Sequence, residues 1–119
     1  MSAQRPSGQA ILQVKSLPQG EVDAAADFYE NWLGQAQALL DGQCTSLVLI
    51  MPEAEGNHRD WRLAAVRGMA RDAAPCRVNM ICGADSEALT VASNYLEFAA
   101  GITGQYLPLD ASGAGNPAA

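Results

Sequence analysis

The chain has 119 residues, of which 49% are hydrophobic, so it can form one domain around one modest core. Its formal net charge of −6 and its pI near 4.5 argue against nucleic acid and anionic membranes as partners. No apolar run approaches the length of a membrane span and the N-terminus is polar, so neither a membrane segment nor a signal peptide is expected, and a cytoplasmic location is predicted.

Basic residues and cysteines are the first candidates for a binding site. Five of the seven basic residues fall within one short stretch among acids, which favours a solvated helix face and its connection, with an anion site as the alternative: Arg59, Arg62, Arg67, Arg71 and Arg77. Three cysteines without metal-ligand spacing are predicted to be buried or incidental thiols in a reducing compartment: Cys44, Cys76 and Cys82.

The first predicted elements are a strand over residues 10–14 and, after a turn, a helix over residues 22–41. An apolar stripe at helical spacing predicts the inward face of this helix: Val22, Ala25, Ala26, Tyr29, Leu33, Ala36 and Leu40. Phe28 and Trp32 lie beside the stripe and widen the apolar surface, which predicts a second contact besides the sheet. Gly42 is predicted to end the helix in a left-handed conformation.

The middle of the chain predicts a buried strand followed by a helix rich in small residues. A strand is predicted over residues 45–51, and its run of five apolar residues, 47–51, is typical of a parallel strand covered on both faces. A helix is predicted over residues 59–74, with one main buried face: Leu63, Val66, Met69, Ala70 and Ala73. Ala64, Ala65 and Gly68 keep much of its remaining surface small, so a neighbouring helix can approach closely.

The last part of the chain predicts a strand over residues 77–82, a helix capped by Asp85 or Ser86, and a strand over residues 105–109. The helix has a predicted inward stripe: Ala88, Leu89, Ala92, Tyr95, Leu96 and Ala99. Pro108 cannot donate a backbone hydrogen bond, so the last strand is predicted to lie at an edge of the sheet or to meet a neighbour on one side only.

Strands that alternate with helices in the order βαβαβαβ predict an α/β fold of four parallel strands and three helices. The expected architecture is a three-layer α/β/α sandwich, half of a Rossmann-like doubly wound sheet. Residues 10–110 are expected to form the domain, with flexible tails at residues 1–9 and 111–119. The outer edge of the first strand is expected to be covered by another subunit, a tail or a separate protein.

Three segments carry a resemblance to a known family. Asn31-Trp32-Leu33-Gly34 fits an Asn-x-x-Gly motif, residues 70–75 with Arg77-Val78-Asn79 fit a helix end and its following strand, and Ile102-Thr103-Gly104-Gln105 leads into the last strand. In this order they resemble the C-terminal half of a short-chain dehydrogenase/reductase. In relatives, the helices that match residues 22–41 and 59–74 pair across a two-fold axis, and the last strand and helix often form a second interface.

The residues that carry the family's chemistry are replaced or absent. The chain has no glycine-rich phosphate-binding turn, so no cofactor is expected. The resemblance places the family's catalytic Tyr at Glu55, its Lys at Arg59 and its Ser near residues 51–52, and only the Asn is kept, as Asn31. These three residues, Asn31, Glu55 and Arg59, are interpreted as a vestigial site, in which Asn31 either hydrogen-bonds the sheet backbone or contacts a ligand.

The remaining polar and aromatic candidates have plainer interpretations. His58, the single histidine, is predicted to be a surface residue rather than a catalytic base. Glu53, Glu55 and Asp60 are predicted to be solvent charges at a helix start, with a carboxylate metal cluster as the alternative. Trp32 and Trp61 are predicted to serve packing or an interface rather than base stacking.

The sequence therefore favours a non-catalytic, short-chain-dehydrogenase-like domain that acts through homo-oligomerisation or by binding a protein partner. The expected interface residues are shared between the two amphipathic helices: Phe28, Trp32, Trp61, Ala65 and Gly68. One alternative is a small oxidoreductase whose NAD(P) site is completed by another chain. The other is a small-ligand-binding module at the C-terminal ends of the strands.

Overall fold

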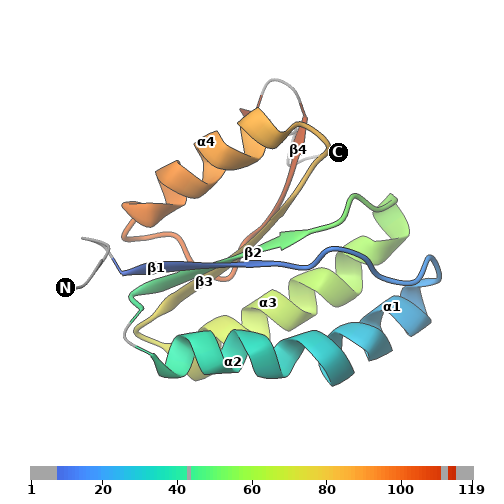
Figure 1. The fold of residues 1–119 in the computed structure, drawn as a ribbon, viewed down its shortest axis with the longest axis horizontal. Helices are drawn as coiled ribbons and strands as arrows, with labels where there is room; N and C mark the ends of the chain where they lie inside the picture. The colour runs from blue at the N-terminus through green and yellow to red at the C-terminus, as the bar shows by residue number, and fades with distance from the viewer. Residues whose placement is uncertain (1–7, 43, 111–112, 115–119) are drawn as a thin grey trace.

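The computed structural model describes residues 8–42, 44–110 and 113–114, whose strands form one sheet (Figure 1). Four parallel strands lie side by side in sequence order: β1 (Gln9–Gln13), β2 (Ser46–Met51), β3 (Arg77–Cys82) and β4 (Tyr106–Asp110). A two-residue strand, β5 (Gly113–Ala114), pairs antiparallel with the end of β4. The four parallel strands are as predicted.

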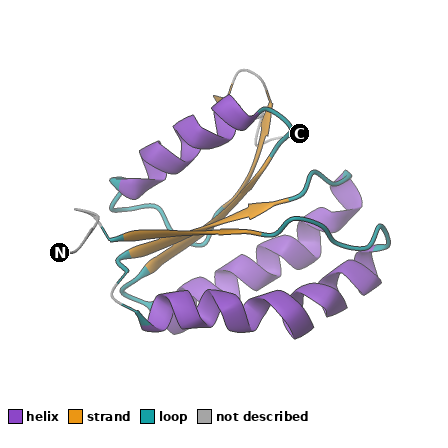
Figure 2. Ribbon diagram, viewed as in Figure 1, coloured by secondary structure: helices purple, strands orange, loops and turns teal. Residues whose placement is uncertain are grey.

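Helices cover both faces of this sheet (Figure 2). One continuous helix consists of α1 (Glu21–Asp27), the π-helical turn η1 (Phe28–Trp32) and α2 (Leu33–Asp41). A 3-10 turn, η2 (Gly56–His58), leads into α3 (Arg59–Ala73), and α4 (Ser86–Glu97) joins β3 to β4. Because α1, α2 and α3 lie on one face and α4 on the other, the predicted α/β/α sandwich is confirmed (Figure 1). None of the helices described here has the length and apolar composition needed to cross a bilayer.

The two central strands, β2 and β3, are buried on both faces, as the apolar run of β2 predicts for that strand. Alternate side chains point to opposite faces of a strand, so each strand contributes to two cores. Leu47 and Leu49 of β2 pack in the core under α1, α2 and α3, whereas Val48 packs in the core under α4. The same alternation in β3 places Met80 in the first core and Ile81 in the second.

The first helix is rotated from its predicted orientation, and the π-helical turn explains the difference. Its buried residues are Ala24, Phe28 and Ala36, while Val22, predicted to face inward, is 77% exposed and Tyr29 is also exposed. In a regular α-helix, side chains four residues apart lie at slightly different angles around the helix axis, and the difference grows along the helix. The π turn contains an additional residue, which reverses this rotation and keeps the buried side chains on one face. Phe28 is therefore a core residue, fully buried, and lies away from the surface where an interface was expected.

Helix ends and the face of α4 test three further predictions. Asp85 caps α4, since its side chain accepts a hydrogen bond from the Glu87 backbone N–H at 3.0 Å, as predicted. Tyr95 was predicted to face inward but is 62% exposed, because the buried face of α4 consists of other residues: Ala88, Ser93 and Leu96. Gly42 has φ −71°, so α2 does not end in the predicted left-handed cap.

Two of the segments that carry the family resemblance are hydrogen-bonded to each other. In β3 the buried Asn79 side chain donates from Nδ2 to the Ile102 carbonyl at 3.0 Å and accepts at Oδ1 from the Gln105 N–H at 3.1 Å. Between them, Gly104 adopts φ +74° and donates its N–H to the Val78 carbonyl at 2.7 Å. The turn before β4 is thus held in place by β3.

The last strand and the expected tails need one correction. Pro108 pairs with Cys82 of β3, and β5 adds partners only for Leu109 and Asp110, so in the described part of the sheet β4 meets one neighbour at Pro108, as predicted. Gln9 and residues 113–114 were expected in flexible tails, but Gln9 begins β1 and residues 113–114 form β5. Residues 1–7, 111–112 and 115–119 lie outside the described residues.

Candidate functional site

A pocket of about 750 Å³ lies at the carboxyl ends of β1 and β2. Residues 17–19, which follow β1, and residues 52–55, which follow β2, form part of its wall. Asn57, His58 and Arg62 complete the wall from η2 and α3. Open parallel sheets bind ligands at this edge, so this strand-end pocket is the first candidate site.

The three residues of the expected vestigial site do not come together in this pocket. Glu55 lines it and is exposed, whereas Arg59 begins α3, is exposed and is not part of the wall. Asn31 lies in the π-helical turn with its side chain exposed, and its Nδ2 donates to the Asp27 carboxylate. Its expected bond to the sheet backbone is therefore wrong, because the turn directs this side chain outward.

His58 was predicted to be a surface residue, but it is buried. The Trp61 indole N–H, which can only donate, bonds to Nδ1 of His58 at 3.0 Å. Nδ1 is therefore the acceptor, and Nε2 donates to the Gln19 carbonyl at 3.0 Å. With both ring nitrogens engaged, His58 ties the start of α3 to the loop after β1 and is not a free catalytic base.

Arg62 was predicted to lie on a solvated helix face, but it is 1% exposed. Its Nη1 donates to the Tyr106 hydroxyl at 3.3 Å, and its guanidinium carbon lies 5.6 Å from the Trp61 ring centroid and 5.9 Å from that of Tyr106. Its Nε is buried and has no hydrogen-bond partner among the described residues. The solvated-face prediction is also wrong for Arg77, whose guanidinium donates to three carbonyls at the end of α4.

The Tyr106 hydroxyl lies between the side chains of Arg62 and Cys82 and contacts both. The Tyr106 hydroxyl lies 3.3 Å from the Cys82 Sγ. Burial and then the hydrogen bond to Cys82 raise the pKa of Tyr106 to about 12, although Arg62 acts in the opposite direction. The phenol is therefore neutral at physiological pH and does not compensate the charge of Arg62.

Helical spacing was the signal that could have identified Arg62. Arg62 lies four residues before Val66 and seven before Met69, so it falls on the same inward face as these apolar residues. The prediction treated its charge as decisive and left it out of the buried face. Tyr106 gave no comparable signal, because its partners lie 44 and 24 residues away in the sequence.

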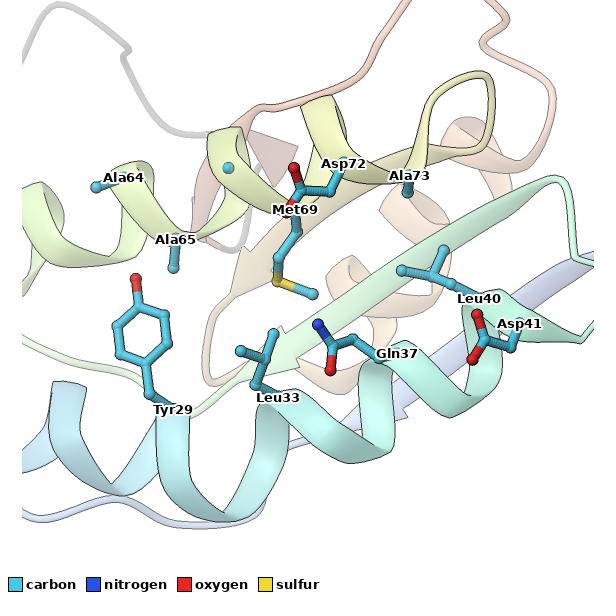
Figure 3. A pocket seen from close by; sticks show the side chains of 11 residues that line it. Tyr29, Leu33, Gln37, Leu40, Asp41, Ala64, Ala65, Met69, Asp72 and Ala73 are labelled. Carbon is cyan, nitrogen blue, oxygen red and sulfur yellow. The ribbon is translucent and has the colours of Figure 1, made fainter.

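A second pocket, of about 460 Å³, lies in the groove between the α1–α2 helix and α3 (Figure 3). Bulky residues line its first wall: Tyr29, Leu33, Gln37, Leu40 and Asp41. Mostly small residues line the wall on α3: Ala64, Ala65, Gly68, Met69, Asp72 and Ala73. Tyr29 points across this interhelical groove toward Ala64 and Ala65 (Figure 3).

The interhelical groove contains two of the five residues expected at an interface, Ala65 and Gly68. The three aromatic residues do not line it. Phe28 lies in the core, and Trp32 and Trp61 are half-buried against that core. Tyr29, which was expected to face the sheet, is the aromatic side chain that the groove presents.

A family model described as short chain dehydrogenase-like protein matches residues 12–109. The chain belongs to this family. The match covers β2, β3, most of β4, the last two residues of β1 and every helix between the parallel strands, in agreement with the resemblance found in the sequence. Comparisons with curated proteins and with solved structures returned no significant match.

The described residues of this short chain dehydrogenase-like domain do not fit the nicotinamide dinucleotide that the family resemblance implies. A dinucleotide pyrophosphate is held by a glycine-rich turn at a helix N-terminus, and the turn between β1 and α1 contains one glycine, Gly20. The exposed carboxylates of Glu53 and Glu55 at the strand-end pocket would repel a pyrophosphate. Within the described ranges, no group of three His, Cys, Asp or Glu side chains is arranged to hold a metal ion.

Proposed function

We propose that this short chain dehydrogenase-like chain is a non-catalytic domain that acts by forming a homodimer through the interhelical groove. The observation that carries the proposal is the shape of the groove, in which bulky side chains on one wall face small ones on α3. A two-fold dimer brings the same surface of both copies together, so each favourable contact is made twice.

The residues of the groove suit the packing of a partner helix. Tyr29 is half exposed, and Leu33 and Met69 add apolar surface beside it. Removing apolar surface from water stabilises a complex by about 25 cal/mol per Å². Gly68 and Ala64 leave room for a second backbone or for the Tyr29 ring of another copy to approach closely.

The polar groups at the family's catalytic positions argue against hydride transfer by this chain alone. A guanidinium is not a proton relay in proteins, so an arginine at position 59 does not replace a catalytic lysine. Tyr106 is the phenol next to the strand-end pocket, but burial and its contact with Cys82 raise its pKa to about 12 against the opposing effect of Arg62, so it keeps its proton at physiological pH. A non-catalytic role requires neither residue to react.

Paired glycine substitutions test the dimer. A Cβ at Gly68 would lie 4.0 Å from its nearest neighbour, the Arg71 Nη2, and one at Gly34 would have nothing within 4 Å. Both Gly68→Gln and Gly34→Gln are therefore expected to fold, and each gains up to about 1 kcal/mol in helix propensity. Light scattering should give a dimer mass for the wild type and Gly34→Gln, and a monomer mass for Gly68→Gln, because glutamine fills the groove.

A monomeric wild type at high micromolar concentration would contradict the proposed homodimer. A Gly68→Gln variant that stays dimeric would place the contact elsewhere, and the edge of β1 is the next surface to test. In the described part of the sheet β1 has a neighbour, β2, on one side only, and Ile11 is exposed on it. An open strand edge can pair with a strand of another protein, so Ile11→Lys would then be expected to dissociate the complex.

The strand-end pocket favours small-ligand binding as a second function. Its walls combine apolar residues with a buried cation at the edge where open α/β sheets take ligands. A thermal-shift screen should find small molecules that raise the melting temperature of the isolated chain. A tight response to NADH or NADPH in the same screen would instead favour the oxidoreductase alternative.

A further inference from the structure

We propose that the strand-end pocket binds a small organic monocarboxylate, whose carboxylate pairs with the buried guanidinium of Arg62. The inference rests on the second function proposed above, small-ligand binding, and names the class of ligand. Three observations support it: the uncompensated charge of Arg62, the lack of a hydrogen-bond partner for its Nε among the described residues, and the acids and apolar residues of the pocket wall.

The first observation is a buried positive charge without a counter-charge. Arg62 is the largest fully buried side chain among the described residues. A guanidinium stays protonated in proteins. The rings of Trp61 and Tyr106 lie close enough to stabilise it, but neither carries a negative charge. Within the described part of the chain its side-chain partner is the neutral Tyr106 hydroxyl. Because an unpaired buried charge is costly, an anion beside Arg62 would be strongly favoured.

The second observation is that one edge of the guanidinium donates a hydrogen bond to the protein and the other edge has a nitrogen without a partner. Nη1 donates to the Tyr106 hydroxyl, whereas Nε has no hydrogen-bond partner. In any arginine the Nε–H and one Nη2–H point in the same direction, so together they can donate to both oxygens of a carboxylate. The unpaired Nε therefore marks the edge that a planar carboxylate fits.

The third observation is the composition of the pocket wall. Glu53 and Glu55 bring two exposed carboxylates to a pocket with one arginine, so a dianion such as phosphate meets more repulsion than a monoanion. Leu17, Pro18 and Pro52 supply apolar surface for the body of an organic molecule. Together these residues favour a monocarboxylate with an apolar body over an inorganic anion.

Benzoate is a suitable probe, and the Arg62 Nε–H is a suitable reporter. In proton–nitrogen correlation spectra of the full chain, benzoate should move the Arg62 Nε–H resonance with a Kd on the order of 1 mM. Benzamide has the same shape without the charge and should not move it. Inorganic phosphate should bind at least about tenfold more weakly than benzoate.

Two variants separate the role of Arg62 from the folding of the chain. Arg62→Met keeps the apolar stem and removes the buried charge, so its melting temperature without ligand should equal or exceed that of the wild type, while benzoate affinity falls at least about tenfold. Arg62→Lys keeps the charge but lacks the planar edge, and it should also lose affinity. Arg59→Met is the matched control on the exposed side of the same helix, and its affinity should stay within about twofold.

Each outcome decides the inference. An Arg62 resonance that does not move with benzoate overturns it, as does wild-type affinity in Arg62→Met or Arg62→Lys. Equal binding of benzamide overturns the carboxylate assignment but leaves small-ligand binding intact. Failure of every compound in the thermal-shift screen, with an unmoved Arg62 resonance, overturns both. If Arg62→Met does not fold, the wild-type spectra and Arg62→Lys still give the answer.

Discussion

Arg62, Tyr106 and Cys82 form a line of contacts beside the strand-end pocket, and each side chain changes the chemistry of the next. The Arg62 guanidinium donates to the Tyr106 hydroxyl, which in turn contacts the Cys82 thiol. Burial and Cys82 keep the phenol protonated more strongly than Arg62 promotes its ionisation. Because this tyrosine is neutral, it does not balance the charge of Arg62, and this is the reason why we propose an anionic ligand there.

The raised pKa of Tyr106 predicts a loss of stability at high pH. The folded state raises this pKa from 10.0 to about 12, so it holds the proton more tightly than the unfolded chain does. The corresponding stabilisation is complete below pH 10 and is lost as the pH rises from 10 to about 12. In urea denaturation, the unfolding free energy of the wild type should therefore fall more steeply over this range than that of Tyr106→Phe. Identical slopes would show that Tyr106 does not titrate in this way.

At the scale of elements, the π-helical turn decides which face of the first helix meets the sheet. It places Phe28 in the core, where the centroid of its ring lies 5.7 Å from the ring centroid of Trp61 on α3. It also leaves Tyr29 half exposed at the interhelical groove. The same helix therefore supplies Phe28 to the core and Tyr29 to the surface proposed for dimerisation, because of its π-helical turn.

Neighbouring aromatic substitutions test this orientation. Phe28→Ala should lower the unfolding free energy by about 3–5 kcal/mol, because it leaves a cavity in the core. Tyr29→Ala should change it by less than about 1 kcal/mol when measured on dilute, monomeric protein. Chemical denaturation of both variants provides the comparison. If Tyr29→Ala lowered the unfolding free energy more than Phe28→Ala does, the result would support the orientation predicted from the sequence, in which Tyr29 faces the sheet.

At the scale of the whole molecule, two surfaces are open to a partner, one between helices and one at the edge of the sheet. Two helical segments side by side leave the interhelical groove on one layer, and β1 leaves a strand edge at one side of the sheet. A 12.5 kDa chain that uses either surface for self-association gains stability from its partner. The groove is the surface on which we base the proposed dimer.

The proposed dimer makes thermal stability depend on protein concentration. Mass action favours the folded dimer at high concentration, so the melting temperature of the wild type should rise with each tenfold increase in concentration. Gly68→Gln, expected to be monomeric, should melt at the same temperature throughout a concentration series in scanning calorimetry. A wild-type melting temperature that is independent of concentration would contradict the dimer.

The candidate sites were less predictable than the fold, and the reason lies in particular residues. Ala65 and Gly68 were placed at an interface from their small size and from the family resemblance, and they line the interhelical groove. Glu55 was placed at the family's catalytic tyrosine position by the resemblance, and it lines the strand-end pocket. Arg62 and His58 were taken for surface residues because they are polar, whereas both are buried by partners that the sequence does not reveal.

The sequence by itself determined the order and type of the elements, since continuous apolar runs and helical spacing are local properties of the chain. It also determined that the strands run parallel, because each is followed by a helix that must cross the sheet. The tertiary structure decided the rotation of the first helix and the burial of Arg62. Both depend on contacts between distant segments, such as Arg62 with Tyr106, 44 residues later. No local pattern contains that information.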